Sequence, residues 1–258
     1  MTFKFKCSAH IGDHIFTLWF LNAAAQYWPH HHFSLWIGPN AFDEIRRLAR
    51  KVPNLEVTDR EDGHTIECWM GRDQFYHHFR QHGRFLEFMA QFHAYLCRKH
   101  GLPEWPMKNK LEMLLPADSL DDAHALKDEA FDVMFINSAA LSGQCGGWDQ
   151  ERVHEMARKC ATSGFKTVVT HPCGLDIPTT LSLGLKLNQL GELASRCKIV
   201  AGVANAPILA TFNEKAFQSV RHWIGYSCDR VNFDDQRVSW AYSPDELELA
   251  LAAQLRTL

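Results

Sequence analysis

The sequence predicts a two-domain α/β protein, and three features indicate this class. Strands and helices alternate over residues 3–58, the alternation stops in an aromatic and histidine-rich middle region, and it starts again at residue 131. Short apolar strands that alternate with helices are typical of parallel sheets, because each helix carries the chain back across the sheet. The 258 residues leave room for two small domains, each with its own core.

The first half is expected to hold three strands joined by two helices. A strand at residues 3–9 runs into a tight turn at Ile11 and Gly12, and an apolar helix follows over residues 13–27. Trp28-Pro29 ends that helix, because the residue before a proline is biased away from helical geometry. The other expected elements are a strand at 33–37, a helix over 41–50 capped by Asn40, and a strand at 55–58.

The middle of the chain departs from this alternation. Residues 74–100 predict two helices that meet near Gly83, with aromatic side chains at the spacing of a core face; a ligand-binding surface or an oligomer contact is the alternative. Residues 101–106 contain a glycine and two prolines and predict a connector. A polar helical stretch is expected over residues 119–129.

The second half repeats the alternation. Its closing helix has Ser243 as N-cap, Pro244 at its first position and Glu246 three residues after the cap, which is a capping-box pattern. The elements expected before it are strands at 131–137, 166–171, 198–203 and 220–226, helices at 150–162 and 190–196, and a short helix from Pro207. We therefore expect two Rossmann-like domains, residues 1–115 and 116–258, that face each other across a cleft.

Composition narrows the function classes. The formal net charge of −3 and the pI of about 6.6 argue against a bulk basic surface for nucleic acid. The eight cysteines are scattered and never form Cys-x-x-Cys, so free and mostly buried thiols in a reducing cytoplasm are the simplest interpretation. No apolar run approaches the roughly 20 residues that cross a bilayer, so no transmembrane segment is expected.

Four stretches in order resemble one protein family. Residues 8–15, Ser-Ala-His-Ile-Gly-Asp-His-Ile, followed by an apolar helix, resemble the opening of the ADP-heptose:lipopolysaccharide heptosyltransferases (glycosyltransferase family 9). Residues 110–116 are similar to the family's linker strand. Residues 143–157, with Trp148, are similar to the phosphate-side turn that opens the second domain. Residues 190–194 with 198–207 are similar to the helix and strand before the donor-diphosphate loop.

The resemblance implies a GT-B fold and sugar transfer from a nucleotide-diphosphate sugar to a hydroxyl acceptor. It implies inverting, metal-independent chemistry without a cofactor, with the acceptor on the N-terminal domain and the donor on the C-terminal domain. Asp13 would then be the general base that removes the proton of the acceptor hydroxyl. A helix N-cap is the other interpretation of Asp13, and the two roles are compatible.

Further site residues follow from their positions beside Asp13 and at the ends of the second set of strands. The expected acceptor-binding residues are His10, Gly12 and His14, although surface or packing roles are the alternative for both histidines. A diphosphate would be bound where small residues and a helix start present backbone N–H groups. The expected donor-binding residues are Ser138, Gly143, Gly146, His171, Asn205, Ala206 and Pro207.

Two alternatives remain open. Residues 204–209, Ala-Asn-Ala-Pro-Ile-Leu, lack the acid, glycine and histidine usual in the family's donor loop, and Gly147 stands where a basic residue is expected. A non-catalytic nucleotide-sugar or sugar-binding relative would fit these differences. A metal-dependent hydrolase is the third hypothesis, because His78 and His82 have the spacing of a metal pair on a helix; a solvated or aromatic-packed face is the alternative for them.

Overall fold

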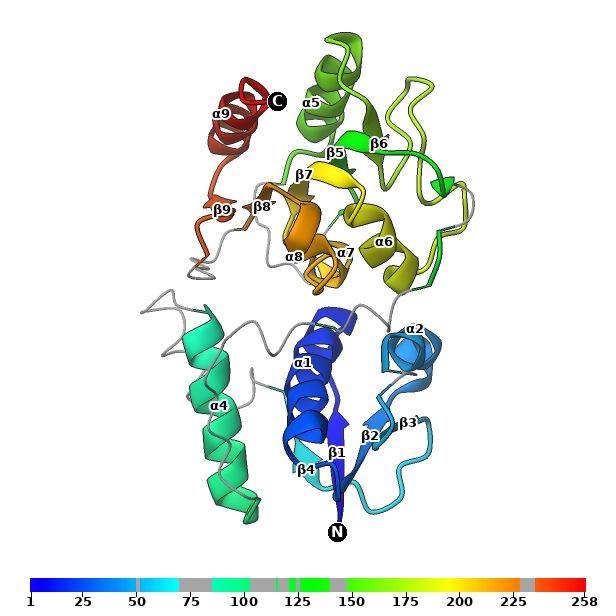
Figure 1. Cartoon of the computed structure of the whole chain (residues 1–258), viewed down its shortest axis with the longest axis vertical. Helices are drawn as coiled ribbons and strands as arrows, with labels where there is room; N and C mark the ends of the chain where they lie inside the picture. The colour runs from blue at the N-terminus through cyan, green and yellow to red at the C-terminus, as the bar shows by residue number, and fades with distance from the viewer. Residues whose placement is uncertain are drawn as a thin grey trace. The chain divides into compact units, whose positions relative to one another are not determined.

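The chain forms two compact units, Met1–Leu120 and Asp121–Leu258, which are described separately. The computed structural model describes residues 1–49, 52–69, 85–102, 115, 121–123, 126–139, 148–227 and 235–258. Each unit contains one parallel β-sheet with helices packed on it (Figure 1). The expected α/β class with two parallel sheets is confirmed, whereas the cleft and the domain boundary after residue 115 stay predictions.

The first unit is built on a four-stranded parallel sheet in the order β3-β2-β1-β4. Its two-residue strand β4 was not expected, because two residues are too few to show a periodic pattern. Its strands are β1 (Thr2–Cys7), β2 (His32–Ile37), β3 (Leu55–Thr58) and β4 (Ile66–Glu67), and its helices are α1 (Ile11–Tyr27), α2 (Pro39–Ala49) and α4 (Phe85–His100).

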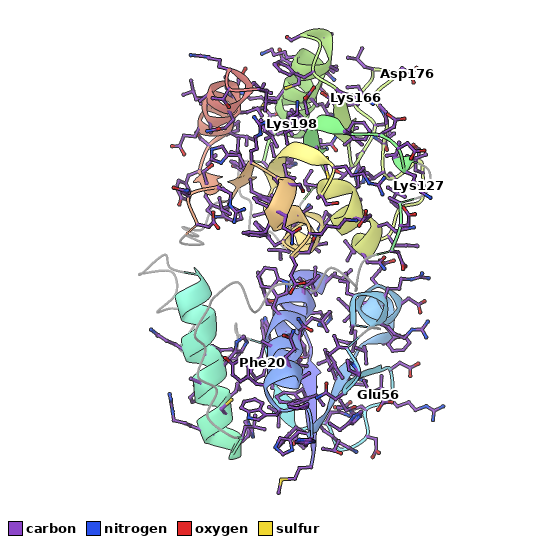
Figure 2. All side chains as sticks on the ribbon, viewed as in Figure 1. Phe20, Glu56, Lys127, Lys166, Asp176 and Lys198 are labelled. Atoms are coloured by element: carbon purple, nitrogen blue, oxygen red, sulfur yellow. The ribbon has the colours of Figure 1, made fainter. Side chains whose placement is uncertain are left out.

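Aromatic side chains join the sheet of the first unit to its helices. The Phe5 ring of β1 lies 5.9 Å from the Phe20 ring of α1 and 6.2 Å from the Phe33 ring of β2, and all three side chains are buried. Phe20, labelled in Figure 2, also stacks on His93 of α4 at 4.0 Å between ring centroids. Helix α1 is therefore packed both against the sheet and against α4, which explains why its sequence has so little polar face.

Two expected helix starts were wrong. Helix α1 begins at Ile11 with His10 as its N-cap, so Asp13 is the third helical residue. Its carboxylate reaches back and accepts a hydrogen bond from the His10 N–H at 3.2 Å, which is the acidic half of a capping box. Helix α2 begins at Pro39 and contains Asn40, because the fixed backbone angle of proline suits the first helical position.

The second unit has a five-stranded parallel sheet in the order β6-β5-β7-β8-β9. Helices α5 and α9 pack together on one face, and α6, α7 and α8 cover the other (Figure 1). The strands are β5 (Phe131–Ile136), β6 (Thr167–Val169), β7 (Cys197–Val203), β8 (His222–Tyr226) and β9 (Val238–Ala241). The helices are α5 (Gln150–Thr162), α6 (Leu187–Ala194), α7 (Ala206–Ala210), α8 (Ala216–Ser219) and α9 (Pro244–Leu255).

Most of the expected elements of the second unit are present, with some differences. Strand β9 and helix α8 were not expected, and the helix expected over 119–129 is absent from residues 121–123, which have no regular structure. The Ser243 cap is confirmed, since its hydroxyl accepts from the Glu246 N–H at 3.2 Å. The Glu246 carboxylate accepts in turn from the Tyr242 N–H at 2.8 Å, one residue earlier than a standard capping box requires.

Two simpler expectations concern the cysteines and membrane-spanning helices, and the described residues agree with both. In the described part of the chain six cysteines are free and buried, namely Cys7, Cys68, Cys97, Cys160, Cys173 and Cys197. The other two, Cys145 and Cys228, lie outside the described residues. Among the helices that the structure describes, none is both long and apolar enough to cross a bilayer.

Candidate functional site

Each sheet has one point where the strand order reverses. In the first unit the chain moves from β1 outward to β2 and β3 and returns to the other side of β1 as β4; in the second it moves from β5 to β6 and returns to the other side of β5 as β7. Open parallel sheets bind ligands beyond the carboxyl ends of the strands at such a point. The candidate positions are therefore the β1/β4 edge and the β5/β7 edge.

At the β1/β4 edge, Glu67 ties the two strand ends together. One carboxylate oxygen accepts from the Ser8 N–H at 3.4 Å and from the Trp69 N–H at 3.1 Å, and the other accepts from the Ser8 hydroxyl at 3.0 Å. These bonds fix the loop between β1 and α1 and therefore the start of α1. Glu67 was missed from the sequence because β4 was missed.

Asp13 lies one turn into α1, directly after this fixed loop. Burial raises the pKa of its carboxyl, an effect opposed by the hydrogen bond from the His10 backbone and by the charge of the His10 ring. Burial raises the pKa of the nearby Cys7 thiol to about 12, and the negative charge of Asp13 contributes to this increase. A partly buried carboxylate with a raised pKa is a stronger proton acceptor than an exposed one.

The three residues expected beside Asp13 differ in accessibility. His10 is exposed at the N-cap position, and Gly12 is half-buried in the first helical turn. His14 is only 3% exposed, and burial and the nearby His10 lower its pKa to about 4, so its ring is neutral at pH 7. His10 and Asp13 are therefore the accessible side chains of this turn, and His14 packs inside the unit.

At the β5/β7 edge, Asn205 joins the two strand ends. Its amide Nδ2 donates to the Ser138 carbonyl oxygen at 3.1 Å and to the Ser138 hydroxyl at 3.0 Å, while its Oδ1 caps helix α7 by accepting from Ile208 N–H at 3.4 Å. Helix α7 has only five residues, so its dipole is weak. The sequence predicts a helix start that presents backbone N–H groups, and the described residues leave one such group at this turn.

One backbone donor remains at the α7 start. Pro207 has no N–H, Asn205 N–H donates to the Val203 carbonyl, and Leu209 N–H donates to the Asn205 carbonyl. Among residues 205–209, only the N–H of Ala206 has no acceptor in the part of the chain that the structure describes. A diphosphate at this turn would find one backbone donor there.

The end of β6 is joined to β5 through Asn137, a residue the sequence did not single out. The Asn137 Oδ1 accepts from the Thr170 hydroxyl and from the His171 N–H, both at 2.8 Å, and its Nδ2 donates to the His171 carbonyl at 2.8 Å. Asn137 is fully buried. His171, expected to end the strand, lies two residues beyond β6, at the same edge as Ser138.

Beyond Asn137 the hydrogen bonds continue to the start of α5. The Gln150 amide donates to the Asn137 carbonyl and accepts from the Trp148 indole N–H at 2.9 Å. The Trp148 ring lies 5.4 Å from the ring of Tyr226, the last residue of β8. Side chains thus connect the carboxyl ends of β5, β6, β7 and β8.

Some expected residues fall outside the described ranges. Gly143 and Gly146 lie in residues 140–147, and the possible metal pair His78 and His82 lies in residues 70–84. Within the described ranges, no group of three or more His, Cys, Asp or Glu side chains could hold a metal ion.

Two units, each with one parallel sheet and helices packed on it, are consistent with a GT-B-like glycosyltransferase fold. Escherichia coli heptosyltransferase WaaC, solved with ADP-2-deoxy-2-fluoro heptose, is 11% identical with a TM-score of 0.58, over 100% of this chain and 99% of that chain. E. coli ADP-heptose LPS heptosyltransferase II is 13% identical with a TM-score of 0.53, over 100% and 99% of the two chains.

A glycosyltransferase family 9 protein from Veillonella parvula is 14% identical with a TM-score of 0.52, over 98% of this chain and 89% of that chain. At these identities the likeness shows the fold. No protein-family model matches the chain, and no curated protein matches its sequence. The resemblance to family 9 that the four sequence stretches indicated is thus shown at the level of the fold.

Proposed function

We propose that the protein is a glycosyltransferase of GT-B type that moves a sugar from a nucleotide-diphosphate donor to a hydroxyl acceptor. The observation that carries the proposal is the position of Asp13, a carboxylate of raised pKa at the β1/β4 strand-order reversal of a family 9 fold. The reaction class is supported by two heptosyltransferase structures, each of which aligns with 100% of this chain.

In the proposed reaction Asp13 removes the proton of the acceptor hydroxyl while the acceptor oxygen attacks the anomeric carbon. The bond from that carbon to the diphosphate breaks on the opposite side, so the configuration inverts and the nucleoside diphosphate leaves. The accessible ring of His10 is proposed to orient the acceptor, with the Gly12 backbone close to it. Metal-independent stabilisation of the leaving group would come from fixed dipoles.

The donor is proposed to bind at the β5/β7 edge, the equivalent point of the second sheet. The residues at this edge are Ser138, Asn205, Ala206 and Pro207. His171 lies beside them, after the end of β6. Gly143 and Gly146 belong to the same proposed site by sequence. The Ala206 N–H is the backbone group best suited to bind a phosphate oxygen, because among residues 205–209 it alone has an N–H without an acceptor in the described part of the chain.

A non-catalytic nucleotide-sugar-binding protein is the second candidate function. It is favoured by the Asn205 side chain, which is fully used in holding Ser138 and capping α7. No acid or histidine stands at residues 204–209 to assist departure of the diphosphate.

The test has a binding step and a turnover step. A thermal-shift screen against UDP, GDP, ADP, dTDP and CMP sugars should find one donor that raises Tm, because a ligand that binds the native state stabilises it. That donor is then assayed for transfer and hydrolysis with wild type, Asp13→Asn and the control Asp176→Asn, an exposed aspartate of the second unit (Figure 2). Turnover lost only in Asp13→Asn supports the enzyme; binding without turnover in wild type establishes the second candidate.

A further inference from the structure

The Gln150 side chain is the centre of a hydrogen-bond network that neither the sequence nor the fold comparison singles out. Gln150 is the first residue of α5, and its amide has three partners. Its Oε1 accepts from Trp148 Nε1 at 2.9 Å, and its Nε2 donates to the Asn137 carbonyl and lies 2.8 Å from His154 Nε2.

Two of these partners determine which way the amide points. The Trp148 indole nitrogen can only donate, and the Asn137 carbonyl can only accept. The amide oxygen must therefore face Trp148, and the amide nitrogen must face Asn137. Turning the amide over would break both bonds.

The remaining amide hydrogen determines the state of His154. It points at His154 Nε2, which must therefore hold a lone pair and accept. The ring is neutral in this arrangement and carries its proton on Nδ1, which lies 3.9 Å from a Glu151 carboxylate oxygen. A proton on Nε2 would place two N–H groups against each other.

The groups around His154 favour the neutral ring. Burial lowers the pKa of His154; Glu151 opposes this, and Arg158 and His171 lower the pKa further. From α9, the nearby carboxylates Asp245 and Glu248 are paired with Arg152 and with Lys159. The charges of α9 are thus directed at other side chains of α5.

We propose that Gln150 is a positioning residue of the donor site, and that it holds Trp148 and Asn137 in place only while His154 is neutral at Nε2. The inference rests on the proposed function in that the β5/β7 edge is taken as the donor site. Protonation of His154 repels the Gln150 amide, and an amide that turns its oxygen toward the new N–H loses its bonds to Trp148 and to the Asn137 carbonyl. Nucleotide binding at this edge therefore weakens as His154 gains a proton.

The first test needs no ligand. In the ¹⁵N-labelled full-length protein, the His154 ring is expected to be the Nδ1–H tautomer at neutral pH. The Trp148 indole N–H signal, assigned with Trp148→Phe, should shift with the same midpoint as His154 when the pH is lowered. A His154 ring with its proton on Nε2 at neutral pH, or a Trp148 signal that stays constant through that titration, overturns the proposal.

The second test separates positioning from general stability by comparing three variants. His154→Gln supplies an acceptor that never gains a proton, so its Trp148 signal should stay constant to about pH 5. Gln150→Glu presents a carboxylate to His154, so it should raise the pKa of His154 above the wild-type value. The control His222→Asn changes a histidine at the amino end of β8, whose Nδ1 bonds the Arg237 carbonyl at 2.9 Å, and should leave the Trp148 titration unchanged.

Binding of UDP, GDP and ADP gives the functional measurement. For a nucleotide that binds, the affinity of each protein is measured at about pH 7.5 and at about pH 5. The loss of affinity should be about tenfold larger in wild type than in His154→Gln. The variant serves as the reference because titration of the nucleotide itself affects both proteins equally. Equal losses in both proteins overturn the proposal. If none of the nucleotides binds, the proposed donor site fails, whereas the tautomer and the Trp148 titration still decide the role of Gln150.

Discussion

The carboxylate of Glu67 binds both the backbone N–H and the hydroxyl of Ser8, at 3.4 and 3.0 Å, across the point where the first sheet reverses its strand order. In the second sheet Asn205 binds Ser138 across the equivalent point, through the carbonyl and the hydroxyl. In both units a serine after the first strand is therefore held by a polar side chain from the other side of the reversal. That side chain is Glu67 of β4 in the first unit and Asn205, two residues after β7, in the second. These bonds keep the edge residues in place without filling the edge with apolar side chains.

Replacing Glu67 by Ala should disturb catalysis more than folding. The loop before α1 loses its two hydrogen bonds from Ser8, and Trp69 loses a third bond, so Asp13 is positioned less accurately. The transfer rate should therefore fall about tenfold or more with donor KM unchanged. The free energy of unfolding should fall by only about 1–2 kcal/mol. Steady-state kinetics and urea unfolding measure the two effects.

Glu56→Ala is the matched control for Glu67→Ala. Glu56 is an exposed glutamate of β3 in the same sheet, and it pairs with the exposed His32 at 3.4 Å (Figure 2). Its removal should change neither rate nor stability measurably. If both variants lose the same activity, the loop is not positioned by Glu67.

Asp13→Asn should raise stability while it abolishes transfer. Because burial raises the pKa of Asp13, the ionised form is less favourable in the folded protein than in the unfolded chain. Asp13 thus stabilises the fold only at low pH, and this contribution is lost as the pH rises through its folded pKa. Asparagine has no charge to bury and keeps an oxygen for the His10 N–H, so Tm at pH 7 should rise.

The same substitution should lower turnover by about 100-fold or more if Asp13 is the base. Thermal unfolding of both proteins at about pH 3 and about pH 7 tests the sign, since the difference between them should shrink at the lower pH. A variant that is less stable than wild type at pH 7 would show that the carboxylate is needed for the cap.

The sequence predicted most of the fold because apolar periodicity is a local property. Strand β3 and helix α5 have the expected bounds, since each combines a clear pattern with a defined start. Strand β4 was missed because it has only two residues. Strand β9, as long as β3, was also missed, and the pairing of both strands depends on neighbours distant in the chain. The start of α1 was placed two residues late, because Asp suits both the N-cap and the third helical position.

The candidate site was predicted less completely than the fold. Asp13 and Asn205 could be singled out, since each stands in a strand-to-helix junction that sequence reading can locate. Glu67, Asn137 and Gln150 could not, because their importance lies in bonds to residues 59, 33 or 13 positions away in the chain. Glutamine at the first turn of a helix carries no signal of its own.

His93→Phe should make the first unit more resistant to acid. His93 is buried against Phe20, and burial lowers its pKa to about 3. In the unfolded chain the imidazole of residue 93 is protonated below about pH 6.5, whereas in the folded protein it stays neutral down to about pH 3. The contribution of His93 to the free energy of unfolding is therefore complete above about pH 6.5 and is lost as the pH falls toward about 3. The loss is at most about 1.4 kcal/mol per pH unit for each such histidine, and His14 adds to it.

Phenylalanine can stack on Phe20 and takes up no proton. Urea unfolding followed between about pH 7 and about pH 4 should therefore show a smaller loss of stability in His93→Phe than in wild type. The exposed His30 serves as the control, and His30→Gln should follow the wild-type curve. Parallel curves for wild type and His93→Phe would mean that other groups cause the acid sensitivity.

Gly202→Ala should strongly destabilise the second unit. Gly202 lies in β7 with φ of 140°, and a Cβ there would lie 2.1 Å from the backbone oxygen of Ile136 in the neighbouring strand β5. Backbone cannot move aside as a flexible side chain can, so the two central strands must separate. Because the peptide groups of β5 and β7 lead directly to Ser138 and Asn205, the edge that we assign to the donor should be distorted as well.

We expect Gly202→Ala to lower the free energy of unfolding by about 3 kcal/mol or more, measured by urea unfolding, and to weaken nucleotide binding by the protein that remains folded. Gly38→Ala is the control: a methyl at Gly38 meets nothing within 4 Å, so its effect should stay within about 1 kcal/mol. Equal stability of the two variants would show that β5 and β7 are not held as close as the structure has them.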